Sequence, residues 1–321
     1  MKELNRDTYL IALSHIQDVS TKTVNGILKE FGSEAGAYAN FFELTADEML
    51  SKHNIPIEEA VKIAEFKSQL PNFAFLNDNL VNQGFTMVAA SDSNYPANLI
   101  NNLGYDRTPS ILYLKGDIEI FKEQCIAIVG SRDANEDDLN YTALLSKKAT
   151  QEFKVVVSGF AKGVDKKALD SALELNGKSI LVLPQGILTF KSGINEYYKK
   201  ILSGDVLILS TFYPTAPWLV KLAMARNAYI YGLAGEIYIP KTNDSGGTWA
   251  GATSGIKKGR KVYVRYLDGK LPANLKLIEL GAIPLDEEGD EIKGFVRGGK
   301  VNPKKKKNIK PPYEEGNLFE N

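Results

Sequence analysis

The chain has 321 residues, of which 44% are hydrophobic, so it is long enough to bury one large core or two modest ones. Its 39 basic residues are balanced by 39 acidic residues, which means that any attraction for an anion must come from a local cluster and not from the overall charge. The one cysteine, Cys125, excludes a disulfide framework and opens an apolar run, so we expect a buried, inert thiol. There is no uncharged apolar run of membrane-spanning length, and we expect a cytoplasmic protein without a membrane partner.

Residues 1–80 are predicted to form a module of short helices. Apolar residues recur at helical spacing, Gly32 follows the second run as a C-cap, and Thr45 stands where a helix N-cap is expected. A hairpin of helices that binds DNA needs a Gly-x-Gly turn, whereas the turn here reads Asp18-Val19-Ser20. We therefore expect this module to pack against the rest of the chain or against another protein.

Residues 81–285 are predicted to form an α/β domain. A bridge with strands at 85–89 and 110–116 leads into a regular alternation of strands and helices, which is typical of a doubly wound, mostly parallel sheet of extended Rossmann type with helices on both faces. The predicted strands are 125–129, 154–158, 179–183, 205–209, 235–239 and 261–264, and the predicted helices lie near 136–151, 165–176, 194–203, 217–231 and 247–258.

The composition changes after residue 285. An acidic run, 286–291, is followed by a basic stretch with almost no apolar periodicity that ends in Lys304–Lys307, and we predict that 286–321 form a disordered basic tail. Such a tail is either a solvated chain end or a non-specific tether to the phosphates of DNA or RNA.

Two consecutive strand–turn–helix units, 125–133 and 155–165, carry the most informative pattern. Each has a β-branched apolar run followed by a Gly/Ser turn, so both turns are expected at the carboxyl ends of neighbouring parallel strands. Backbone N–H groups at helix starts favour an anion there, and Arg132 and Lys162 add positive charge. The pattern predicts a phosphate-bearing ligand, although either turn alone is also explained by sterics and Asp165 by N-capping of the next helix.

These two units, read as Val129–Arg132 and Ser158–Asp165, resemble the DNA-processing protein A family, DprA, also called Smf. Further matches follow in order at Asn94–Pro96, Leu112–Gly116, Arg226-Asn227 and Ser245–Thr248. The resemblance implies a small amino-terminal module related to SAM and helix-hairpin-helix folds. It also implies a homodimer that binds and protects single-stranded DNA and loads a RecA-type recombinase, in DNA uptake, natural transformation or a related recombination pathway. No enzymatic activity, metal or cofactor is implied. Departures at Lys162, Leu169, Thr211 and Pro240 indicate a divergent member.

The resemblance also assigns roles to individual residues of this chain. Arg132, Lys162 and Arg226 would neutralise phosphates, and Asn227 would bond to phosphate or sugar. Backbone N–H groups and hydroxyls would come from the three glycine-rich turns, and the predicted site is completed by Gly130, Ser131, Ser158, Gly159, Gly163, Ser245, Gly246 and Thr248. A second interpretation makes Arg226 a charge near the C-terminus of a helix whose Trp218, Leu219, Leu222 and Ala223 face the core.

Two other function classes remain open from the residues. The same superfamily fold is found in proteins that bind nucleotide derivatives and in phosphoribohydrolases. Phosphoribohydrolase chemistry needs a glutamate near the turn, but Pro240 and Lys241 stand there, and Glu236 lies at the far end of its strand. Both histidines, His15 and His53, fall in the helical module, so the α/β part has no imidazole for a triad, a metal site or a proton shuttle. The third class is a scaffold that binds partners only.

Overall fold

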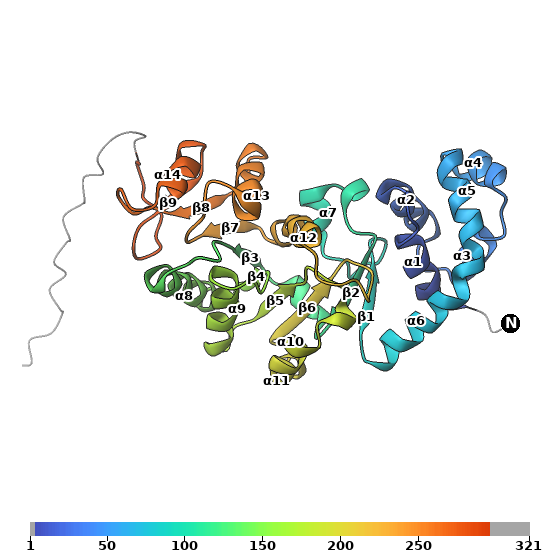
Figure 1. Cartoon of the computed structure of the whole chain (residues 1–321), viewed down its shortest axis with the longest axis horizontal. Coiled ribbons are helices and arrows are strands. Elements are labelled where there is room, and N and C mark those ends of the chain that lie inside the picture. Colours follow the sequence, from blue (N-terminus) through green and yellow to red (C-terminus); the bar gives the residue numbers. More distant parts are fainter. Residues whose placement is uncertain (1–3, 296–321) are drawn as a thin grey trace, which may run out of the picture.

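The structure, a computed structural model, describes residues 4–295 and places a group of short helices beside a long twisted sheet (Figure 1). The helices of the amino-terminal group have apolar faces that meet in one core. They are α1 (Arg6–Ser14), α2 (Thr21–Phe31), α3 (Ala35–Phe41), α4 (Ala46–His53), α5 (Ile57–Phe66) and α6 (Leu70–Asn82), with a 3₁₀ turn, η1 (Lys67–Gln69), before α6.

Local sequence signals set the ends of these helices as predicted. Thr45 caps α4 in a reciprocal capping box with Glu48, and Gly32 ends α2 with a φ of 56°. Asp18 in the first turn also has a positive φ, and its carboxylate pairs with Lys62 at 2.8 Å. That turn therefore makes a contact within the module.

The module is joined to the sheet through polar contacts as well as apolar packing. His15 Nε2 lies 2.8 Å from the Tyr113 hydroxyl of β2. The His15 and Tyr213 rings form a T-shaped contact with their centroids 5.1 Å apart. Asn25 Nδ2 donates to the Thr108 carbonyl at 3.0 Å, and Arg6 pairs with Asp92. Because buried polar groups of both parts satisfy one another, the joint is specific.

In the described part of the chain the sheet has nine strands in the order β1-β2-β6-β5-β4-β3-β7-β8-β9. Among these strands only β2 runs opposite to the rest, so the expected doubly wound, mostly parallel sheet is confirmed. The strands are β1 (Thr86–Ala89), β2 (Ile111–Lys115), β3 (Cys125–Ile128), β4 (Val155–Ser158), β5 (Ser179–Val182), β6 (Val206–Ser210), β7 (Glu236–Ile239), β8 (Val262–Arg265) and β9 (Ile283–Leu285).

Helices cover both faces of the sheet. Below it in Figure 1 lie α8 (Glu136–Gln151), α9 (Val164–Glu174), α10 (Lys191–Glu196) and α11 (Tyr198–Leu202); above it lie α7 (Ala97–Leu103), α12 (Val220–Leu233), α13 (Gly246–Lys257) and α14 (Pro272–Glu279). Further 3₁₀ turns are η2 (Tyr105–Arg107), η3 (Ile118–Lys122) and η4 (Ile187–Thr189).

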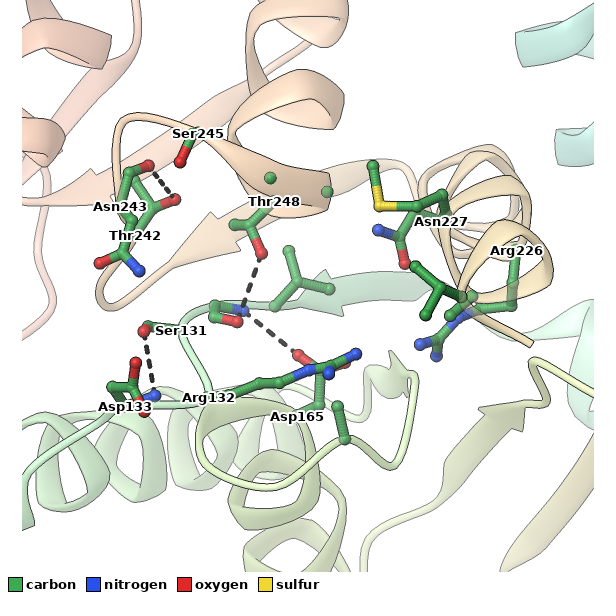
Figure 2. A pocket seen from close by; sticks show the side chains of 18 of the residues that line it. Ser131, Arg132, Asp133, Asp165, Arg226, Asn227, Thr242, Asn243, Ser245 and Thr248 are labelled. Carbon is green, nitrogen blue, oxygen red and sulfur yellow. Dashed lines mark hydrogen bonds between the residues drawn. The ribbon is translucent and has the colours of Figure 1, made fainter. Parts of the chain in front are cut away.

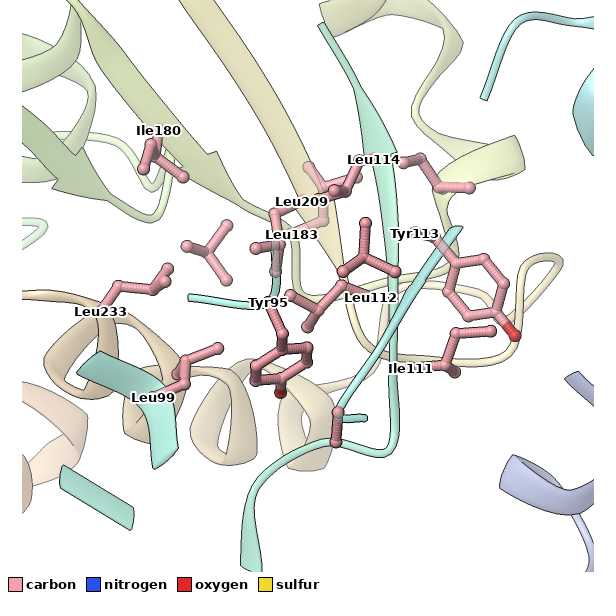
Figure 3. Packing of buried hydrophobic residues seen from close by; sticks show 14 of the residues in the cluster. Tyr95, Leu99, Ile111, Leu112, Tyr113, Leu114, Ile180, Leu183, Leu209 and Leu233 are labelled. Atoms are coloured by element: carbon pink, nitrogen blue, oxygen red, sulfur yellow. The ribbon is translucent and has the colours of Figure 1, made fainter. Parts of the chain in front are cut away.

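Two apolar cores hold these layers together. One lies under α8 and α9, where Ile128 and Val156 of the sheet meet Leu145 and Ala168. The other, larger core covers the opposite face, also takes in residues such as Leu169 of α9 and Ile201 of α11, and continues into the helical module. Figure 3 shows its part around Leu112, Leu209, Leu99 and Leu233. Strands buried on both faces read as continuous apolar runs, which explains why they were recognisable in the sequence.

The order of the strands creates a switch point beside β3. From β3 the chain moves outward to β4, β5 and β6, and then α12 returns it to the other side of β3, where β7, β8 and β9 follow. The connections that leave the carboxyl ends of β3 and β7 therefore diverge to opposite faces. A crevice at this place is where open α/β sheets bind ligands.

Some elements differ from the sequence prediction. The strand β9 and the helices α7 and α14 were not predicted, and the helix expected near 194–203 is two short helices, α10 and α11. The first residues of the predicted tail pack on the sheet domain: the Tyr141 hydroxyl donates to the Asp286 carbonyl at 2.8 Å, and Lys148 pairs with Asp290 at 2.6 Å. The rest of that tail, from residue 296, lies outside the described residues.

Burial within β3 raises the pKa of Cys125 to about 12, in agreement with the expected inert thiol. Among the helices of residues 4–295, none combines the length and the apolar character needed to cross a membrane.

The packed His15 ring makes stability sensitive to acid. Burial lowers the pKa of His15 from its usual 6.5 to about 4, so the folded chain keeps the ring neutral where the unfolded chain already binds a proton. This contribution is complete above about pH 6.5 and is lost as the pH falls toward 4, by roughly 1–3 kcal/mol. Urea denaturation of the His15→Gln variant should show a weaker dependence on pH between 4 and 7. A profile identical to that of the parent chain would contradict the role given to this ring.

Candidate phosphate-binding site

A cavity of about 340 Å³ lies at the switch point, at the carboxyl ends of β3 and β7 (Figure 2). Three segments far apart in the sequence form its walls: the loop after β3, one side of α12, and the loop that leads into α13. The polar and charged residues that line it are Ser131, Arg132, Asp133, Asp165, Arg226, Asn227, Thr242, Asn243, Ser245 and Thr248.

Hydrogen bonds from three other segments hold the loop after β3 in place. The Gly130 N–H donates to Asp165 Oδ1 at 3.2 Å, and the Gly130 carbonyl accepts from Thr248 Oγ1 at 3.3 Å. The next residue, Ser131, donates its N–H to the Lys241 carbonyl at 2.9 Å. Because α9, α13 and the loop after β7 all hold this loop, it is a preformed wall of the cavity.

Asp165 does not cap α9, and this corrects the interpretation from the sequence. The N-cap of α9 is Gly163, which has a φ of 88° and provides no side-chain cap; Asp165 lies inside the first turn and is buried. Burial raises the pKa of Asp165, while the positive charge of Arg226 and the Gly130 N–H oppose that shift. Its carboxylate therefore anchors the neighbouring loop.

Arg226 is a buried cation in the middle of α12, not a charge at its end. The side chain is only 3% exposed because it lies on the same side of the helix as Ala223 and Ile230, three and four residues away. Its Nη1 donates to the Val182 carbonyl at 3.0 Å, and its Nε has no hydrogen-bond partner among the described residues. Burial lowers the pKa of Arg226, and the nearby charge of Asp165 opposes this shift.

Gly159 makes room for this guanidinium. A Cβ atom at Gly159 would lie 1.5 Å from Arg226 Nη1, so any other residue there would displace the arginine. The adjacent Ser158 donates its hydroxyl to the Ile128 carbonyl at 2.7 Å and so ties β4 to β3. Ser158, Gly159 and Gly163 thus lie beneath the cavity and do not line it.

The two other predicted cations are exposed. The guanidinium of Arg132 extends over Asp165 toward Arg226 in Figure 2, and it has no ion pair within residues 4–295. Lys162 lies on the loop between β4 and α9, is exposed, does not line the cavity, and likewise forms no ion pair in the described part of the chain. Arg132 and Arg226 therefore converge on one space, and Lys162 stands outside it.

The start of α13 presents backbone N–H groups to the same space. Ser245 is the N-cap but its side chain makes no capping bond, and Gly246, Gly247 and Thr248 all line the cavity. The first N–H groups of a helix have no partner within the helix, and they attract anions. The loop before them is held by Asn274 Oδ1, which accepts from the Thr242 N–H at 3.0 Å.

The cavity also has an apolar part that we did not predict from the sequence. Trp218 and Leu219 were expected in the core, but they are 47% and 40% exposed, because α12 begins only at Val220. Trp218, Val220 and Met224 line the cavity beside the charged residues. Pro217 is compatible with a helix that starts beside it, so no local signal distinguished that start from the observed one at Val220.

The arrangement suits anion binding. Two arginines, a set of helix N–H groups and the hydroxyls of Ser131 and Thr248 face the cavity, whereas both histidines lie in the helical module. Within residues 4–295 no cluster of His, Cys, Asp and Glu side chains is arranged to hold a metal ion.

Comparison with known proteins agrees with the motifs. The model of the family described as DNA recombination-mediator protein A matches residues 86–294, which contain the whole cavity. This chain belongs to that family. The resemblance to DprA and Smf proteins inferred from the sequence is thereby confirmed.

Two members of this family align with somewhat less than two thirds of the chain. The DNA processing protein DprA of Streptococcus pneumoniae is 30% identical over 203 residues, 62% of this chain and 71% of that protein. The DprA of Bacillus subtilis is 27% identical over 205 residues, 62% of this chain and 68% of that protein.

Solved DprA structures share the fold. The structure of DprA from S. pneumoniae matches with a TM-score of 0.71 and 23% identity, over 88% of this chain and 95% of that one. DprA from Helicobacter pylori, whose structure is described as giving its single-stranded DNA binding mode, matches with a TM-score of 0.54 and 23% identity, over 63% of this chain and 90% of that one.

The anchoring role of Asp165 predicts a difference between two substitutions. Asp165→Asn keeps an oxygen that accepts from the Gly130 N–H, whereas Asp165→Ala leaves this N–H without its partner. Both remove the charge beside Arg226, so the difference between them reports the remaining acceptor oxygen and the buried volume of the side chain, and not the charge. The alanine variant should be less stable than the asparagine variant by about 1–2 kcal/mol in chemical denaturation. Equal stabilities would show that the carboxylate does not anchor the loop.

Proposed function

We propose that this chain binds single-stranded DNA by holding its phosphates in the cavity at the switch point. A single observation carries the proposal. Arg226 is buried, its side chain lines the cavity, and its Nε has no hydrogen-bond partner among the described residues. Asp165 lies near enough to offset part of the cost of burying this cation, but the two form no ion pair in the described part of the chain, and an incoming anion would add a direct partner.

The other groups complete a site for a sugar-phosphate chain. Arg132 is exposed and free to reach a second phosphate oxygen, and a guanidinium suits phosphate because its donors form a planar fork. The N–H groups at the start of α13 would donate hydrogen bonds to the remaining phosphate oxygens. The cavity of about 340 Å³ is roughly tenfold the volume of one water molecule, which leaves room for a sugar beside the phosphate.

The remaining residues of the predicted site keep supporting or peripheral roles in this proposal. Asn227 lines the cavity and would bond to phosphate or sugar, and Ser131 offers a hydroxyl. Thr248 donates its hydroxyl to the Gly130 carbonyl, so it would contribute its backbone N–H. Lys162 would meet a phosphate outside the cavity, along the path of the strand. Ser158, Gly159 and Gly163 would act by shaping the floor.

Membership in a family of recombination mediators supports the wider biological role. We infer that the chain protects single strands and delivers them to a RecA-type recombinase, in DNA uptake, natural transformation or a related pathway. It would do so in the cytoplasm and as a homodimer. Co-sedimentation with a RecA-type recombinase on oligo(dT) tests the delivery step.

We propose binding without catalysis in preference to the nucleotide-hydrolysing alternative. Glu236, the nearest glutamate in sequence to the α13 turn, lies at the amino end of β7, where Lys154 and Lys261 neutralise it at 3.2 and 3.5 Å. Lys241, at the place where that chemistry wants an acid, pairs with Asp138 at 2.7 Å.

Binding of single-stranded DNA and hydrolysis of nucleotides predict different ligands in a thermal-melting experiment. A true ligand raises the melting midpoint by mass action, so oligo(dT) should raise it and nucleoside monophosphates at the same phosphate concentration should raise it far less. A larger shift with a nucleoside monophosphate, together with release of its base, would support the hydrolase and not the proposal.

Removing the exposed cation tests the cavity itself. Arg132→Ala should weaken oligo(dT) binding and reduce the slope of log K against log salt by about one unit, whatever the base sequence. Arg107→Ala is the matched control, because Arg107 is also exposed but lies in η2 beside α2. Filter binding at several salt concentrations measures both. If the Arg132 variant binds like the parent chain, DNA does not bind in this cavity.

A further inference from the structure

An apolar ledge borders the charged cavity. It consists of Trp218, Val220 and Met224, which are 47%, 65% and 48% exposed. All three line the same cavity as Arg132 and Arg226. Exposed apolar residues scattered singly are ordinary, but three large ones gathered on the wall of a cationic cavity indicate an apolar ligand group.

The ledge is held in place before any ligand arrives. Trp218 follows a loop whose carbonyls are engaged: Pro214 accepts from the Leu188 N–H at 2.9 Å, and Ala216 accepts from the Gly186 N–H at 2.9 Å. Pro214 and Pro217 restrict the backbone on the way to Trp218. Val220 and Met224 lie four residues apart on one side of α12, the side away from the core. Little conformational freedom is therefore lost when the ledge is covered.

The ledge and the cavity together match a nucleotide unit. A ligand that fills the cavity and covers the ledge needs an anionic group and, close to it, a flat apolar surface. A strand whose phosphate lies against Arg226 has bases beside that phosphate, and every base offers a π-face to an aromatic ring. A protein partner would need an acidic and an apolar side chain at this spacing, whereas a nucleic acid has both in each repeat.

We propose that Trp218, supported by Met224 and Val220, stacks on a base and thereby makes the chain select single-stranded over double-stranded DNA. This inference rests on the proposed binding of phosphates in the cavity. Phosphates are common to single strands and duplexes, so the cationic cavity alone cannot distinguish them. In a duplex both faces of each base are covered by neighbouring bases, and the ledge then has nothing to stack on. Stacking is tolerant of sequence, so selection between strand states comes without selection between bases.

A strand without bases separates the two contributions. The probes are oligo(dT) and an abasic oligonucleotide of equal length, which has the same phosphates. The parent chain should bind oligo(dT) roughly 5- to 150-fold more tightly than the abasic strand, the range that corresponds to stacking of one base. In Trp218→Ala the two affinities should converge and the preference for single strands over a duplex should fall by the same factor, while the salt slope stays unchanged. Trp218→Phe should keep part of the preference.

Fluorescence gives a second readout with a matched variant. The chain has two tryptophans, and Trp249 is half-buried in α13 against the large core. In Trp249→Phe, emission comes from Trp218 alone, and oligo(dT) should quench it far more than the abasic strand does.

The outcomes distinguish the two proposals. If the parent chain binds neither strand, the phosphate site and the ledge both fail. If it binds both strands equally and the Trp218 variants change nothing, phosphate binding stands and the stacking role is overturned. Equal losses for both strands in Trp218→Ala would also overturn it, because they would indicate a structural role.

Discussion

A buried guanidinium in the middle of α12 is the group around which the cavity is arranged. Arg226 lies over Gly159, its Nη1 is held by the carbonyl of Val182, and the carboxylate of Asp165 provides the opposing charge. The same carboxylate anchors the loop after β3 through the Gly130 N–H. The position of the cation and the shape of the loop are therefore coupled through one acidic side chain, and neither is set by its own segment alone.

The strand order explains why such a cation can be placed there. Because α12 returns the chain across the sheet, it lies over β3, β4 and β5 at the point where the loops diverge. A residue on its inner side therefore faces the strand ends, where Arg226 donates to the Val182 carbonyl at the end of β5. On the inner side of α12, Arg226 therefore stands where an apolar side chain would otherwise pack. Burying this cation costs free energy, and ligand binding would offset that cost.

Much of this arrangement was predictable from the sequence. Continuous apolar runs such as Val155–Val157 identified the parallel strands, and the Gly/Ser turns after them placed the loops at one edge of the sheet. The convergence of Arg132, Arg226, Asn227 and Ser245 on one cavity followed from family motifs. The short elements were missed for a physical reason: β9 has three residues including a proline, and α7 has only one fully buried residue, Leu99, so neither carries a clear period.

The misassigned residues share a different cause. Asp165 resembles an N-cap by position, but its partner lies 35 positions away in the chain, and such a contact leaves no local pattern. For α12, a starting point three residues too early placed Trp218 in the core, whereas Trp218 precedes the observed helix and is 47% exposed. Because burial depends on what packs against a segment, this small error in the helix start was enough to hide a residue that lines the cavity.

Amide hydrogen exchange with and without a bound oligo(dT) strand tests the phosphate cavity most directly, because the donors assigned to phosphate are backbone N–H groups. We predict slower exchange at the start of α13, residues 246–249, and in the loop 130–133 when the strand is bound. Unchanged exchange in both segments, with protection confined to the helical module of residues 6–82, would contradict it.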